Sequence, residues 1–159
     1  MSARRALMTF TALLTLTACD PLFSTQYRQP LVPLAGDPCV EDALRSSRLI
    51  SMVEREKSSY DHDATSSYHI VVRDTSAMGG EWEGEASRER RHDSTWVKVS
   101  YSYMGYATPP KQERARWEVQ AHEILETVRA QCAPDVPSAT TCKAVGGIGG
   151  QRGACSTGV

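Results

Sequence analysis

Residues 96–103 have the sequence Trp-Val-Lys-Val-Ser-Tyr-Ser-Tyr, the most regular stretch in a chain of 159 residues. Its valines and tyrosines alternate with lysine and serine. A period of two residues is typical of a β-strand with one apolar and one polar face. We therefore predict a strand over 96–103 that turns its valines and tyrosines toward the core and Lys98 with the serines away from it.

A long helix is predicted directly after this strand, over residues 108–132. Thr108 is a typical N-cap residue, and prolines such as the two that follow it are common in a first helical turn. Pro134 ends the pattern. The apolar residues between them recur at steps of three, four and one, which gives one continuous apolar stripe: Trp117, Ala121, Ile124, Leu125, Val128 and Cys132.

Upstream of residues 96–103 we predict one helix and two further strands. The pair Asp37-Pro38 is typical of a helix start, and apolar residues at helical spacing extend this helix over 38–57. Residues 68–72, Tyr-His-Ile-Val-Val, are rich in β-branched side chains and predict a strand. Residues 81–86 alternate glutamates with apolar or small residues, which predicts another strand with its glutamates facing water.

These elements predict an α+β domain over residues 37–132 with the order α-β-β-β-α. Its three strands would form a small antiparallel meander with both helices on one face, which leaves the other face polar. Residues 133–159 are rich in glycine and proline and have few large apolar side chains. We expect them to form a tail without a core of its own.

The first 18 residues have the regions of an export signal. Arg4 and Arg5 precede an apolar run that ends at Leu16 and is too short to span a bilayer. Residues 16–19, Leu-Thr-Ala-Cys, resemble the lipobox of bacterial lipoproteins. The resemblance implies that signal peptidase II cuts before Cys19, which carries a diacylglyceryl group and an acylated amine. An ordinary signal peptide with a cysteine near its cut site is the alternative.

The lipobox resemblance implies attachment to a bacterial membrane, with the domain in the periplasm. Residues 1–18 are then a lipoprotein signal peptide, and residues 19–36, which contain three prolines, are expected to be an extended lipidated tether. Asp20 follows the lipidated cysteine. In enteric bacteria an aspartate at that position tends to retain a lipoprotein in the inner membrane, so we expect the inner rather than the outer membrane.

Four cysteines remain after Cys19, and an even number in an exported chain favours disulfide bonds. The two predicted helices bring Cys39, in a first turn, to Cys132, in a last turn, if they pack antiparallel. We therefore predict the pair Cys39–Cys132. Cys142 and Cys155 would then close the tail into a loop.

The charge balance argues against nucleic acid as a partner. Residues 1–18 contain two arginines and no acid, so their removal leaves 16 basic and 19 acidic residues. A chain without a basic excess lacks the electrostatic attraction that phosphate backbones require.

Motifs with metal, nucleotide or catalytic chemistry are incomplete in this sequence. His122-Glu123-Ile124-Leu125-Glu126 has glutamate where the zinc motif H-E-x-x-H has its second histidine. Asp61-His62-Asp63 lies in a serine-rich connection typical of a solvated turn. The glycines of 146–153 lack the lysine that follows a phosphate-binding loop. We therefore predict no metal, no cofactor and no catalytic residues.

The function expected from the sequence is a non-catalytic binding module that recognises an envelope protein or a cell-wall partner. A basic cluster before residues 96–103 is the candidate contact region, through Arg88, Arg90 and Arg91. Lipid headgroups, an anionic polymer and an acidic partner are all compatible with it. An inhibitor or immunity protein against a secreted hydrolase is an alternative function, and a small envelope hydrolase is a further one.

Overall fold

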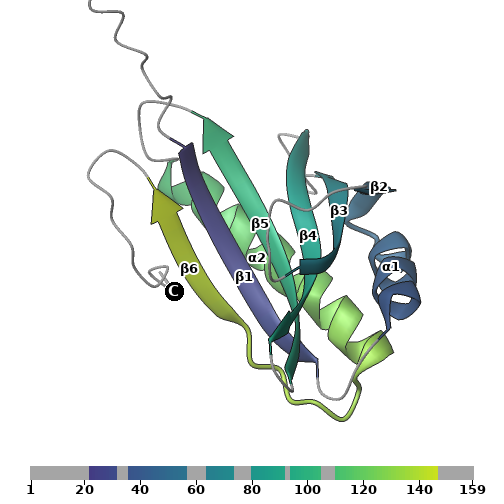
Figure 1. The fold of residues 1–159 in the computed structure, drawn as a ribbon. Coiled ribbons are helices and arrows are strands. Elements are labelled where there is room, and N and C mark those ends of the chain that lie inside the picture. The colour runs from purple at the N-terminus through teal and green to yellow at the C-terminus, as the bar shows by residue number, and fades with distance from the viewer. Residues whose placement is uncertain are drawn as a thin grey trace, which may run out of the picture.

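The computed structural model describes residues 22–31, 36–56, 64–73, 80–91, 94–104 and 110–146, and these form a six-stranded antiparallel sheet with two helices. The elements in chain order are β1 (Leu22–Leu31), α1 (Asp37–Ser46), β2 (Ile50–Arg55), β3 (Ala64–Arg73), β4 (Glu81–Arg91), β5 (Ser94–Met104), α2 (Lys111–Cys132) and β6 (Thr141–Gly146). The strand order is β2-β3-β4-β5-β1-β6. Figure 1 shows α2 lying across one face of this sheet, with α1 beside its C-terminal part.

The expected three-stranded α-β-β-β-α domain is wrong, because the sheet contains three further strands. The predicted strands 68–72, 81–86 and 96–103 lie within β3, β4 and β5. The additional strands are β1, within the predicted tether, β2, within the second half of the predicted first helix, and β6, within the predicted tail. The fold is therefore more β-rich than the sequence patterns indicate.

A bulge explains why β2 has a helical spacing of apolar residues. Helix α1 ends at Ser46, and the following backbone is extended at Ser47. Ile50 and Val53 are three residues apart, yet both are buried, because the pairing of β2 with β3 shifts register between Ile50 and Met52. An inserted residue in a strand changes the period of its buried face from two toward three. This period matches that of an amphipathic helix.

β1 lacks the apolar alternation that predicts a strand, because some of its buried residues are polar. Its buried positions alternate, but they include Thr25 and Gln29. The Gln29 side chain donates to the carbonyl of Pro137 and accepts from the amide of Ala139, so it holds the segment that leads into β6. Pro30 lies beyond the end of the β6 ladder, where a strand tolerates a proline.

The core lies between the helices and the sheet. Trp117 of α2 stacks on Tyr101 at 5.6 Å between ring centroids and meets Trp82 edge-on at 5.8 Å. Five of the six residues in the predicted stripe of α2 are buried, and the sixth, Cys132, packs against the core. The predicted Cys39–Cys132 disulfide is confirmed and joins the first turn of α1 to the last turn of α2.

Candidate functional site

The helices cover only one face of the sheet, and we call the opposite surface the polar face. In β4 the residues with odd numbers point to it, and the even-numbered Trp82 and Ala86 point toward the helices, as the alternation over 81–86 predicts. The polar and charged side chains of the polar face include Gln26, Arg28, Glu54, Ser67, His69, Arg73, Glu81, Glu83, Glu85, Ser87, Glu89, Lys98, Ser100 and Lys143, and the apolar Met52, Val71 and Trp96 lie among them.

Three charged side chains meet on the polar face, toward the end of β4. Arg28 of β1 and Lys98 of β5 are directly opposite each other in the strand register. The Glu89 carboxylate lies 3.1 Å from Lys98 Nζ and 3.5 Å from Arg28 Nη2. The side chains of Glu89 and Lys98 are 1% and 5% exposed. Glu89 therefore neutralises two cations that would otherwise face each other in a poorly solvated place, which is a structural role.

The exposed part of the polar face carries charges of both signs, because the exposed Arg73 is opposite Glu81 and the exposed Lys143 is opposite Gln26 in the register. Glu54, Glu81 and Glu83 are exposed, and Glu81 accepts a hydrogen bond of 3.0 Å from Ser51. His69 lies between Glu54 and Glu85 in the register. The described residues nevertheless contain no group of three or more histidines, cysteines, aspartates or glutamates that could hold a metal ion.

The basic cluster predicted from the sequence is divided by the structure. Arg88 points to the helix side, where Nη1 lies 2.9 Å from Asp37 and 2.8 Å from Thr65, so its side chain ties β4 to the start of α1 and is buried. Arg90 is exposed near the end of β4. The side chain of Arg91 lies outside the described residues. Extending the alternation of 81–86 by two residues would have indicated the inward direction of Arg88.

The residues of the incomplete zinc motif have partners on the surface of α2. Arg48 donates to Glu123 at 2.6 Å. Arg129 donates to both carboxylate oxygens of Glu126 and holds the pKa of that carboxyl below its ordinary value. His122 is exposed, with its ring 6.3 Å from that of Tyr27. These contacts are those of an ordinary solvated helix face.

Several predicted positions lie outside the described residues: Cys19, Cys155, residues 61–63 and residues 147–153. Cys142 is disulfide-bonded, packs against the core from β6, and has Cys155 as its predicted partner.

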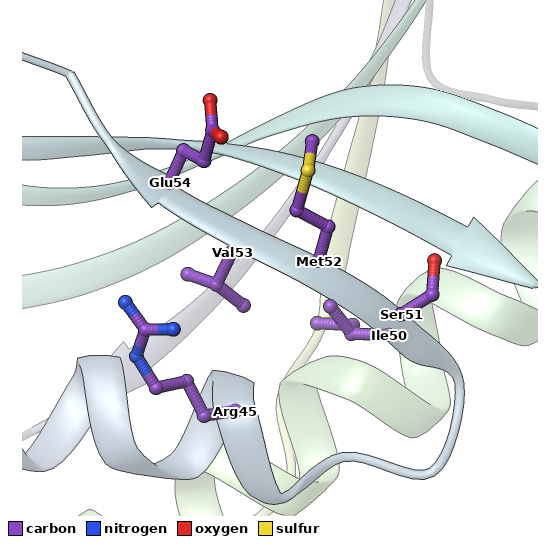
Figure 2. Close-up of a pocket in the computed structure, with 6 residues that line it drawn as sticks. All are labelled: Arg45, Ile50, Ser51, Met52, Val53 and Glu54. Atoms are coloured by element: carbon purple, nitrogen blue, oxygen red, sulfur yellow. The ribbon is translucent and has the colours of Figure 1, made fainter.

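The edge of the sheet at β2 carries a pocket of about 340 Å³. Figure 2 shows Arg45 extending from α1 toward the strand, with Ile50 and Val53 on the helix side and Met52 and Glu54 on the other. Met52 is 37% exposed. An edge strand has backbone N–H and C=O groups without a neighbouring strand, and an extended peptide can pair with them. The sequence could not indicate this site, because its residues fit a helix.

Scans against protein-family models, curated proteins and solved structures find no match to this chain. Among the described residues no helix is long and apolar enough to cross a membrane.

Proposed function

We propose that this protein is a lipid-anchored, non-catalytic binding module of the bacterial envelope, with its domain in the periplasm. The observation that carries the proposal is the lipobox-like sequence Leu-Thr-Ala-Cys at residues 16–19, directly before a disulfide-linked domain. Disulfide bonds form and persist in oxidising compartments such as the periplasm. Asp20 favours retention in the inner membrane.

The partner that the fold supports best is an envelope protein with an extended segment, which docks along β2. Main-chain hydrogen bonds to the strand edge would provide affinity, and the pocket beside Arg45 and Met52 would select side chains of the segment. β2 is only six residues long, is bulged and carries Glu54 and Arg55. Such features restrict indiscriminate pairing of edge strands, so recognition would depend on the pocket.

Replacing Cys19 with serine is expected to abolish lipid attachment and cleavage by signal peptidase II, because the thiol is the acylated group. Metabolic labelling with a fatty-acid analogue measures this directly. Cys142→Ser is the matched control and should keep full labelling. Unchanged labelling of the Cys19→Ser protein would contradict the proposal and favour the ordinary signal peptide.

A photo-crosslinking amino acid at position 52 is expected to capture the partner in intact envelopes. The same amino acid at Val119, an apolar residue of α2 that is 66% exposed, is the matched control and should capture none. Equal capture at positions 52 and 119 would argue against the β2 edge.

Charge reversal of Arg90 and Arg91 together should reduce capture at position 52 without lowering thermal stability, if these arginines steer an acidic partner. A hydrolase activity lost on substitution of His122 would favour the enzyme alternative instead.

A further inference from the structure

The distance in sequence between the lipidated residue and the sheet restricts the orientation of the domain. Cys19 is separated from Leu22, the first residue of β1, by Asp20 and Pro21 alone. Three residues in a fully extended chain span at most about 11 Å. If Cys19 is acylated, as the proposed function requires, the start of β1 lies within that distance of a residue at the membrane surface.

β1 is too well embedded in the sheet to act as a tether. It pairs with β5 over ten residues and with β6 over six. Its side chains include Tyr27 and Leu31, which are buried in the core. Detaching β1 to lengthen the link would break two ladders and expose these side chains to water. The link between lipid and domain is therefore short.

The elements beside the start of β1 identify the end of the domain that lies nearest the lipid. In the register Leu22 is opposite Met104, the last residue of β5, and Phe23 is opposite Gly146, the last residue of β6. Figure 1 shows that the ends of β5 and β6 and the start of α2 gather around the start of β1. Lys111, the first residue of α2, is exposed there.

The opposite end of the domain carries the hairpin between β4 and β5. Leu31, the last residue of β1, pairs with Thr95, and Arg90 pairs with the same Thr95. A strand of ten residues is about 30 Å long at roughly 3.3 Å per residue. Arg90 is thus separated from the start of β1 by about the length of the sheet.

From this geometry we propose that the domain stands with the starts of β1 and α2 and the ends of β5 and β6 against the phospholipid headgroups. The hairpin with Arg90 then points into the periplasm, away from the lipid. The orientation leaves Arg90 accessible from the periplasm and removes it from the headgroups.

The test uses the full-length lipoprotein in vesicles of phosphatidylethanolamine and phosphatidylglycerol that contain a headgroup-linked quencher. A genetically encoded fluorescent amino acid replaces either Lys111 or Arg90, which are both basic and exposed and so form a matched pair. We expect quenching several-fold stronger at position 111 than at position 90. Equal quenching at both positions, or stronger quenching at position 90, overturns the orientation.

Lengthening the link provides a second, independent measurement. Twenty Gly/Ser residues inserted between Pro21 and Leu22 have a root-mean-square length of about 25 Å. This insertion should lower the quenching at position 111 toward the value at position 90, and an unchanged difference would overturn the role of the short link. The intact mass of the purified protein separates the two proposals. A missing acyl mass overturns lipidation and orientation together, whereas an acylated protein with equal quenching overturns the orientation alone.

Discussion

Replacing both Cys39 and Cys132 with serine is expected to lower the free energy of unfolding by roughly 4–5 kcal/mol. The disulfide joins residues 93 positions apart, and its loop contains all of β2, β3, β4 and β5 and nearly all of α1 and α2. Without the bond the unfolded chain gains the conformational freedom of that whole loop. For a domain of this size the melting temperature should fall by roughly 10 °C or more, as measured by circular dichroism.

The matched control for this disulfide removes Cys142 and Cys155, the predicted pair of the tail. A loop of about 13 residues is worth roughly 3 kcal/mol in the chain-entropy model. Its loss should therefore lower the melting temperature less than the loss of Cys39–Cys132. Equal effects of the two double variants would contradict the view that the long-range bond is the main covalent support of the core.

Glu89→Gln is expected to lower the free energy of unfolding by roughly 3–5 kcal/mol, the usual cost of breaking a buried ion pair. The substitution keeps the size of the side chain and removes its charge. Arg28 and Lys98, which are directly opposite each other in the β1–β5 register, then face each other without the carboxylate that now neutralises them. Like charges directly opposite in a sheet repel, and the Lys98 side chain is only 5% exposed.

A double variant distinguishes charge from packing in this cluster. Glu89→Gln combined with Lys98→Met removes the lysine charge together with its counter-charge, and it should recover a substantial part of the lost stability. Urea unfolding of the wild type, the two single variants and the double variant gives the coupling energy between residues 89 and 98. A double variant with the summed loss of the two single variants would show that the ion pair contributes no coupling.

The local periodicity of apolar residues was sufficient to predict the helices and strands whose buried faces consist of large apolar side chains. The alternation over 96–103 lies within β5, and the apolar stripe from Trp117 to Cys132 belongs to α2. The same patterns placed Cys39 and Cys132 at the ends of two helices that meet, and this led to the confirmed disulfide. In each case the pattern of apolar residues along the chain was enough to predict which side chains face the core.

The elements that local patterns missed depend on partners far away in the chain. Gln29 is acceptable in the core because residues 137–140 satisfy its amide, about 110 positions away. β2 has the apolar spacing of a helix, and only its bulged pairing with β3 makes it a strand. A short segment with mixed polarity has little intrinsic preference, so the available sheet edge decides its conformation.

The sequence alone determined a disulfide between two helix ends and strands with one polar side, and the lipobox-like residues 16–19 stay a prediction. The tertiary structure decided which side chains meet and which are buried. The strand order placed β2 at an edge of the sheet. The alternation of side chains along β4 turned Arg88 toward the helices, where it contacts Asp37. The strand register brought Glu89 within reach of both Arg28 and Lys98. The reason is physical: a side chain's direction follows from its own strand, but its partners and its burial follow from pairing between distant strands.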